Sequence, residues 1–392
     1  MGKAVLPAYT DPGDFPIERR DMTSMVISRR HILALMAGAA LAPGTVVAAG
    51  RQPLYISANT SAPGGSEARR HGVSLLDTDG MIVAQFDLPS RGHAAAVDPA
   101  RRVAVLFARR PGTFAAVIDL SRQKLLRLIE SQPDRHFYGH GCFSADGRFL
   151  FATENDFDGE RGALGIYDAE QGFARVGELP SHGIGPHEAI LMPDGETLAA
   201  ANGGVLTHPS APRMKLNVAD MQPSLTLIRI RDGALLAEYK PDPSLHQSSI
   251  RHVAANAAGD IAFVMQWEGD EREQPPLVGL LRRQAVSFHA APGTVQGAMR
   301  NYCGSVTYAA NGKSFLVSSP RGDVLTEWRA DGSFLRAHAF PDSCATSEMG
   351  ADGFFVTNGG GEIGRVSPRT SKVAEVASYP ELKWHNHIRR IG

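Results

Sequence analysis

The chain has 392 residues, of which 43% are hydrophobic and 21% are charged, and its formal net charge is -1. This composition is typical of a globular protein with ample apolar material for a core. Because the chain is nearly neutral and has no long run of Lys or Arg, we expect no broad surface for nucleic acid. The three cysteines, Cys142, Cys303 and Cys344, lie too far apart for a disulfide framework, so one bridge and three buried thiols both remain open.

The first 49 residues are predicted to be an export signal. Arg29 and Arg30 precede a segment, 32–49, in which no residue is charged and Ala and Gly are frequent. A basic start, a short apolar run and small residues at the end favour cleavage near Ala49 and Gly50. The paired arginines are similar to a twin-arginine address, so we expect a protein delivered folded to the periplasm.

Two alternatives concern this same segment. An uncleaved membrane anchor would need about 20 strongly apolar residues, whereas the run 32–49 is barely long enough and contains Pro43 and Gly44. A start at Met22 or Met25 would give a more compact signal, so we expect the residues before it to be a misassigned extension. No later segment is long and apolar enough to span a membrane, so we expect none in the mature protein.

Residues 50–392 are predicted to form one all-β domain built from repeats. Short β-rich runs follow turns that favour the positive φ angles of tight hairpins. Such turns include Asp146–Gly147, Asp194–Gly195, Asn311–Gly312 and Asp352–Gly353. A second series of turns, which includes Asp79–Gly80, Asp232–Gly233 and Asp331–Gly332, lies within the same units. Two hairpins per unit indicate four strands per unit.

The units have roughly the length of a propeller blade, about 40 to 65 residues. Seven of them begin near Pro53, Gly92, Gly139, Pro186, Arg251, Tyr302 and Ser343. The predicted fold is therefore a seven-bladed β-propeller of the YVTN or WD40 type. The final run, 384–391, follows a complete seventh unit and is expected to close the ring as the innermost strand of the first blade, which removes both sheet edges. A β-sandwich or two separate domains is the alternative.

Two segments interrupt the repeat, residues 203–223 and the acidic residues 266–276, which end in Pro275 and Pro276. In a propeller, insertions of this kind lie on a rim or a face, where ligands and partners bind. A solvated loop without a binding role is the alternative for both.

Histidines recur at nearly the same phase of the repeat. Four of them, His93, His140, His187 and His252, precede the inner turn of their unit by seven or eight residues, and the final strand adds His385 and His387. Innermost strands line the central channel, so these side chains are predicted to converge at one channel mouth. Neutral imidazoles suit Fe, Cu and Zn, which makes a transition-metal site the sharpest hypothesis.

Carboxylates and an arginine lie close to these histidines in sequence. Glu154, Asp156 and Glu188 could complete the ligand set or orient imidazoles as outer partners, and Arg251 could bind an anionic ligand or pair with a carboxylate. A one-residue difference in phase turns a strand residue to the other face unless a bulge absorbs it. The alternative is therefore a set of channel-lining polar residues, or histidines satisfied by hydrogen bonds between blades.

Several strings of residues resemble domain-of-unknown-function family 1513 over roughly residues 51–392. These strings are 137–141, 153–156, 181–188, 201–204, 221–225, 249–252, 318–322 and 384–387. The resemblance implies a secreted, propeller-like protein that often carries a twin-arginine signal. It also implies genes that lie beside those for imelysin-like iron-regulated proteins and di-haem oxidoreductases. The family supplies no catalytic residue to carry over.

Three functions follow as expectations. The first is a periplasmic binding protein, accessory to iron or other transition-metal acquisition, with iron-uptake or haem-containing redox proteins as partners. The second is a metal-dependent periplasmic oxidoreductase or lyase that uses the same histidines. The third is a metal-free interaction scaffold. We lean towards a protein that is not an enzyme, because no nucleophile elbow or phosphate-binding loop is present in the sequence.

Overall fold

The computed structural model describes residues 52, 54–61, 69–98, 103–211, 214–368, 370 and 372–392. All of them lie in one compact unit, Thr45–Gly392. The predicted export signal, its paired arginines and its cleavage point lie outside the described residues. Among those that are described, no helix is long and apolar enough to cross a membrane.

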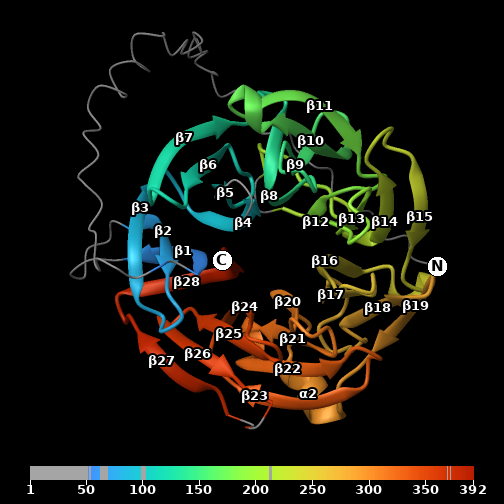
Figure 1. The fold of residues 1–392 in the computed structure, drawn as a ribbon. Coiled ribbons are helices and arrows are strands. Elements are labelled where there is room, and N and C mark those ends of the chain that lie inside the picture. Colours follow the sequence, from blue (N-terminus) through green and yellow to red (C-terminus); the bar gives the residue numbers. More distant parts are fainter. Residues whose placement is uncertain are drawn as a thin grey trace, which may run out of the picture. The chain divides into compact units, whose positions relative to one another are not determined.

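The described residues form seven antiparallel sheets of four strands, arranged as blades around a central axis (Figure 1). Blade 1 contains β28 (Leu382–Arg390), β1 (Tyr55–Ser61), β2 (Arg70–Leu76) and β3 (Ile82–Leu88). Blade 2 contains β4 (Gly92–Asp98), β5 (Val103–Ala108), β6 (Phe114–Asp119) and β7 (Lys124–Glu130). Blade 3 contains β8 (Arg135–Phe143), β9 (Phe149–Asp156), β10 (Arg161–Asp168) and β11 (Ala174–Pro180).

The other four blades follow in chain order. Blade 4 contains β12 (Pro186–Leu191), β13 (Thr197–Asn202), β14 (Ser224–Arg229) and β15 (Leu235–Tyr239). Blade 5 contains β16 (Ser248–Ala255), β17 (Ile261–Trp267), β18 (Val278–Arg282) and β19 (Ala285–His289). Blade 6 contains β20 (Ser305–Tyr308), β21 (Ser314–Ser319), β22 (Val324–Arg329) and β23 (Phe334–Ala339). Blade 7 contains β24 (Ser343–Met349), β25 (Gly353–Asn358), β26 (Glu362–Val366) and β27 (Ala374–Ser378).

The helices of the described residues are short and lie between strands. They are η2 (Ala169–Gln171), η3 (Val218–Asp220), η4 (Pro243–Leu245), α2 (Gly293–Ala298) and η5 (Pro320–Gly322). The inner turns have the backbone that the repeat requires, since Gly147, Gly195 and Gly312 have φ angles of 70°, 72° and 67°. The seven-bladed propeller is therefore confirmed, and each first strand begins within a few residues of the predicted position.

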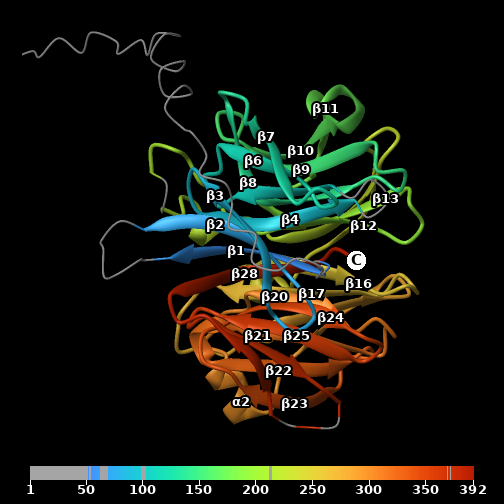
Figure 2. The same ribbon diagram turned by 60° about the vertical axis from the view of Figure 1, so that its left-hand side comes forward.

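The ring closes through the last strand, as predicted. β28 pairs antiparallel with β1, with Tyr55 opposite Arg390 and Ser61 opposite Leu382. Both views place β28 beside β1, and the chain ends close to the axis of the ring (Figures 1 and 2). Neighbouring innermost strands also contact one another around the ring, so residues far apart in sequence meet at the axis.

The apolar core is divided among the junctions between blades. One cluster joins Ile56 and Val73 of blade 1 to Leu106 of blade 2, and another joins Leu316 of blade 6 to Val356 of blade 7. Among the described residues there are seven such clusters, one at each junction. Because every blade is held from both sides, the innermost strands are fixed relative to one another.

The two predicted insertions meet at one mouth of the channel, beside the N-terminal ends of the innermost strands. They follow β13 and β17, whose C-terminal ends lie next to the starts of β12 and β16. Lys215 of the first insertion pairs with Glu268 of the second. Thr207 lies 3.4 Å from the Tyr138 hydroxyl and accepts a 2.9 Å bond from Asn155 through its backbone oxygen. We call this end the covered mouth.

Candidate metal centre

Five histidines from five blades lie together at the axis. They are His387 of β28, His93 of β4, His140 of β8, His187 of β12 and His252 of β16. Their ring centroids lie between 4.5 Å (His140 to His387) and 5.9 Å (His93 to His187) apart in the contacting pairs. Each is buried, with an exposed fraction between 1% and 8%. We call this group the histidine cluster.

A β-bulge accompanies every histidine of the cluster. The pairing register shifts between Gly92 and Ala95 around His93, and between Phe137 and Gly141 around His140. Similar shifts occur at His187, beside His252, and between Ser57 and Asn59 opposite His387. A bulge adds residues to one strand and redirects a side chain. Histidines whose phase differs by a residue therefore still point to the same axis.

Gly139 makes the close approach of two blades possible. Its φ angle is 106°, and a Cβ atom added there would lie 2.5 Å from Cδ2 of His93. No side chain fits at that distance, and few residues other than glycine adopt that backbone. Gly139 therefore gives the His93 ring its position beside His140.

Glu188 orients two imidazoles. Its Oε2 lies 3.1 Å from Nδ1 of His252 and its Oε1 lies 3.5 Å from Nδ1 of His140. Arg389 donates a 2.7 Å bond to Oε1, which gives the buried carboxylate a cationic partner. A carboxylate accepts hydrogen bonds, so the proton of each imidazole is held at Nδ1 and Nε2 is left for another partner.

Burial favours the neutral form of four imidazoles of the cluster. It lowers the pKa of His93, His187 and His387 well below the usual value, and neighbouring histidines lower it further. Burial also lowers the pKa of His252 to about 4, although Glu188 acts in the opposite direction. Burial opposes ionisation of Glu188, but His140 and Arg389 outweigh it and hold the pKa of this carboxyl well below its usual range. Neutral imidazoles are the form that binds a metal.

The donor atoms fit a transition metal. Two groups of three, His93 with His140 and His187, and His140 with His252 and His387, each have donor atoms within 4.8 Å of one another. Three nitrogens that each lie about 2.1 Å from one metal are about 3.4 Å apart in a tetrahedral site, so the rings of a group would have to approach one another by up to about 1.4 Å to bind an ion. Nε2 of His140, Nδ1 of His187 and Nε2 of His387 are buried and have no hydrogen-bond partner among the described residues. Such atoms are costly unless a ligand satisfies them.

His385, which we predicted as a ligand, belongs to neither group of three. Its Nδ1 lies 2.9 Å from the backbone oxygen of Gly92 and its Nε2 lies 2.8 Å from the Thr60 hydroxyl. Both ring nitrogens are therefore satisfied by the protein. The bulge between β28 and β1 separates the roles of His385 and His387, although the two are only two residues apart.

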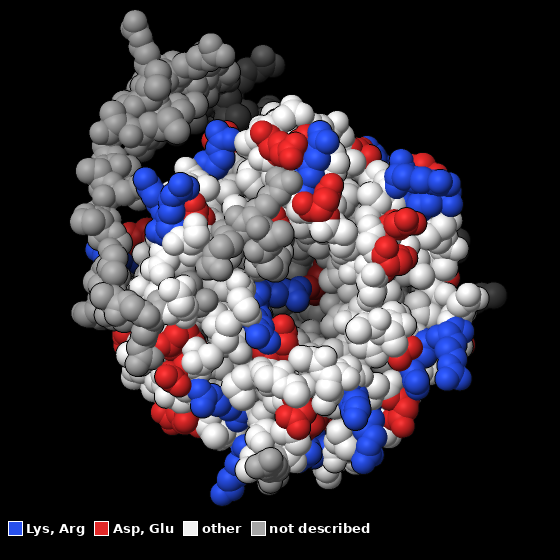
Figure 3. Space-filling view, viewed as in Figure 1, with Lys and Arg blue, Asp and Glu red and all other residues white. Residues whose placement is uncertain are grey.

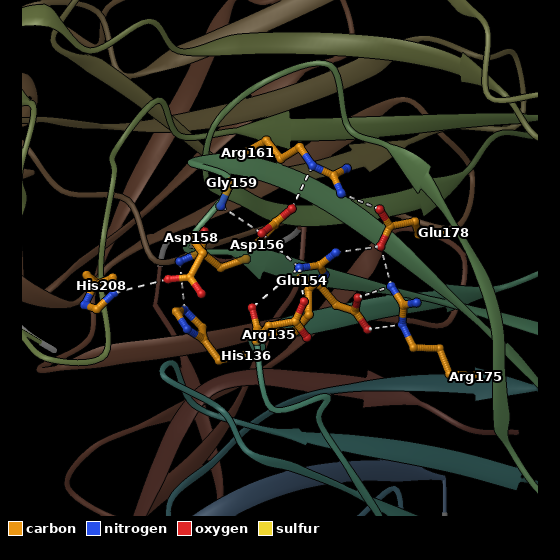
Figure 4. Close-up of polar contacts among 12 residues, drawn as sticks. Arg135, His136, Glu154, Asp156, Asp158, Gly159, Arg161, Arg175, Glu178 and His208 are labelled. Atoms are coloured by element: carbon orange, nitrogen blue, oxygen red, sulfur yellow. Dashed lines mark hydrogen bonds and ion pairs between the residues drawn. The ribbon is translucent and has the colours of Figure 1, made fainter.

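Glu154 and Asp156, predicted as outer partners of the metal, lie in an ion-pair network inside blade 3 (Figure 4). Glu154 accepts bonds from Tyr167 (2.6 Å) and Arg175 (2.8 Å). Asp156 pairs with Arg135 (2.9 Å) and Arg161 (2.7 Å). Both are on β9, the second strand of the blade, whose partners are β8 and β10. Nearness in sequence to His140 therefore did not place them at the axis.

Arg251 lies beside the cluster, and Arg389 is a residue that our sequence reasoning missed. Arg251 is the extra residue of the β16 bulge and donates a 3.2 Å bond to Glu268. Arg389 reaches Glu188 from the final strand. The sequence feature that could have identified Arg389 is its position two residues after His387, because alternate residues of a strand lie on the same face.

The three cysteines are free thiols. Burial raises the pKa of Cys142 and Cys303 to about 12 and places that of Cys344 well above its usual value. None of them belongs to either group of three donors described above.

The second mouth of the channel opens into two cavities. Their volumes are about 480 and 510 Å³, and both are lined by Ile190, Leu191, Arg389 and Arg390. The lining residues follow the histidines along the innermost strands, so these cavities lie at the opposite end from the insertions. The centre of the ring is hollowed in the space-filling view, with basic and acidic side chains side by side (Figure 3). We call this end the open mouth.

Comparisons with known proteins support the fold and the family. A chain of hydrazine synthase from Kuenenia stuttgartiensis is similar in structure, with 15% identity, a TM-score of 0.57, and coverage of 86% of this chain and 99% of that one. This identity is too low to indicate more than a shared fold. A functionally unknown protein from Desulfotomaculum acetoxidans DSM 771 has 11% identity, a TM-score of 0.48, and coverage of 80% of this chain and 91% of that one. No curated protein matches the chain. The family described as "Protein of unknown function (DUF1513)" matches residues 86–391, and this chain belongs to it.

Proposed function

We propose that this protein binds a transition metal through the histidine cluster and serves iron or other metal acquisition in the periplasm. The observation that carries the proposal is the set of five buried imidazoles at the axis, three of whose nitrogens have no hydrogen-bond partner among the described residues. Burying so many polar groups without partners is unfavourable, and a bound cation is the simplest way to satisfy them. Imidazole ligands suit Fe, Cu and Zn.

Each residue has a defined part in this site. His140 belongs to both groups of three, so it is the central ligand. Glu188 holds His140 and His252 with Nε2 directed away from the carboxylate, and Arg389 balances the charge of Glu188. The open mouth, with its two cavities, offers the route by which an ion reaches the cluster.

Metal analysis of the protein purified from its native host tests the proposal. We expect a stoichiometric amount of one transition metal, which is lost when His140, His187 and His252 are all replaced by Gln. His385→Gln is the matched control, because His385 is a buried histidine of the same channel that lies outside both groups of three. Thermal unfolding of each variant shows that it is folded. A native protein without stoichiometric metal contradicts the proposal.

We also propose twin-arginine export to the periplasm, supported by Arg29 and Arg30 ahead of the uncharged segment. Replacing both by Lys is expected to leave the unprocessed protein in the cytoplasm, as measured by cell fractionation. The chain supplies its own control in Arg19 and Arg20, a second pair of arginines that no such segment follows directly. Equal export of both double variants would contradict the proposal. Iron-uptake proteins and haem-containing redox proteins of the periplasm are the proposed partners.

A further inference from the structure

The rings of the histidine cluster contact one another in a definite order. Four of them form a closed sequence, with centroid distances of 5.9 Å for His93 and His187, 4.7 Å for His187 and His252, 4.7 Å for His252 and His387, and 4.6 Å for His387 and His93. His140 contacts all four, at centroid distances between 4.5 and 5.4 Å. The pair His93 and His187 and the pair His252 and His387 therefore form opposite sides of this sequence.

Each of these pairs forms a donor group with the same fifth histidine. Donor atoms of His93 and His187 lie within 4.8 Å of one in His140, and so do donor atoms of His252 and His387. Nitrogens around one ion lie closer together than this, at about 3.4 Å in a tetrahedral site. His140 can approach one pair only by moving away from the pair on the opposite side. Both groups therefore cannot close around an ion at the same time.

His140 has one nitrogen to offer to an ion. Its Nδ1 faces Oε1 of Glu188 at 3.5 Å, whereas its Nε2 is buried and has no hydrogen-bond partner among the residues that the structure describes. A neutral imidazole with its proton at Nδ1 has a single lone pair for a metal, at Nε2. Two ions would need both nitrogens of His140, and Glu188 would then lose one of its two imidazole partners.

The two groups differ in how firmly their ligands are held. Glu188 lies 3.1 Å from Nδ1 of His252 and also faces His140, so one carboxylate orients two of the three imidazoles in the group that contains His387. In the other group of three, only His140 has such a contact among those that the structure describes. An imidazole oriented in this way is a more basic ligand, and it loses less freedom when it binds.

We infer that the histidine cluster holds one ion, which occupies either of two positions that share His140 as a ligand. The tight position is formed by His140, His252 and His387, and the weak position by His93, His140 and His187. An ion that moves between them exchanges two imidazoles for two others while His140 stays bound. This inference rests on the proposed function, because it concerns the same ion.

The experiment titrates the metal-free protein with Co²⁺, whose visible spectrum reports its ligands. We expect one Co²⁺ per chain. The variant with both His93→Gln and His187→Gln is expected to bind one Co²⁺ with an affinity close to that of the wild type. The variant with both His252→Gln and His387→Gln is expected to bind one Co²⁺ about 10- to 100-fold more weakly and with a different spectrum. His140→Gln is expected to lose both forms. These substitutions leave the backbone beside His140 in place.

Anomalous diffraction from cobalt-loaded crystals of each double variant locates the ion, which we expect at a different position in each. His385→Gln is the matched control and is expected to bind like the wild type, and thermal unfolding shows that each variant is folded. Equal weakening in the two double variants, or no binding when His252 and His387 are replaced, overturns the inference. Two ions bound per wild-type chain overturn it even if a double variant does not fold. A wild-type protein that binds no Co²⁺ contradicts the proposed function itself.

Discussion

Blades 1 to 5 and blades 6 and 7 have the same four-stranded plan but differ at the axis. Each of the first five places a histidine there through a bulge in its innermost strand. In blade 6, β20 pairs with β21 without any shift of register and carries no histidine. In blade 7, β24 has a bulge, but the residue it contains is Cys344. The comparison shows that the repeat brings one part of each innermost strand to the axis. A bulge there turns a side chain towards the axis, and the type of that residue decides whether it can bind a metal.

The largest expected effect comes from Gly139→Ala, which breaks the arrangement of the first five blades. The new Cβ would clash with the His93 ring at a φ of 106°. We expect loss of stoichiometric metal and a decrease in unfolding free energy of about 1–3 kcal/mol. Gly259→Ala is the matched control, because its φ is 83° and nothing lies within 4 Å of the added atom. Equal metal content in both variants would contradict the assigned role of Gly139.

A second prediction separates two buried glutamates of blades 3 and 4. Glu188→Gln is expected to weaken metal binding by about 10- to 100-fold, because the imidazoles lose the group that orients them. Glu154→Gln is expected to cost about 3 kcal/mol of unfolding free energy, because Arg175 loses a buried partner, with no change in metal binding. Metal titration and chemical unfolding of both variants measure the difference. The opposite pattern would show that Glu188 serves stability alone.

A third prediction concerns the pH dependence of the metal-free protein. The pKa of His136 and that of His252 are lowered to about 4, and that of His385 to about 3, mainly by burial. Below about pH 6.5 the unfolded chain binds protons that the folded chain does not, so stability is full above this pH and falls towards pH 4. Each such histidine accounts for up to about 3 kcal/mol across this range. Thermal unfolding between pH 8 and pH 4.5 with a chelator checks this, and an unchanged melting temperature below pH 6.5 would contradict it.

The smallest expected effect is that of Cys344→Ala in blade 7. The thiol is buried and belongs to neither group of three donors, so it is not expected to bind the metal. We expect a loss of about 1 kcal/mol in unfolding free energy from the lost packing, with unchanged metal content. Reduced metal content in this variant would show that blade 7 contributes to the site.

The sequence predicted the ring because its cause is local. Turns such as Asp146–Gly147 and Asp331–Gly332 recur at fixed places in each unit, and the extra strand at the end has no other partner. The phase of the histidines predicted their convergence at the axis. Which of His385 and His387 joins the cluster depends on a bulge in β28, and no turn residue in the sequence predicts that bulge. The error for Glu154 arose because neighbouring strands of one blade lie at different distances from the axis.

The closing strand β28 has a consequence for how such a site forms. It contributes His387 to the cluster and Arg389 to Glu188, and it is the last strand of the chain. A chain without β28 therefore has an incomplete donor set, and the full set exists only after β28 has paired with β1. An ion bound there would link the end of the chain to blades 2 to 5, and its binding energy would add to the barrier against opening the ring.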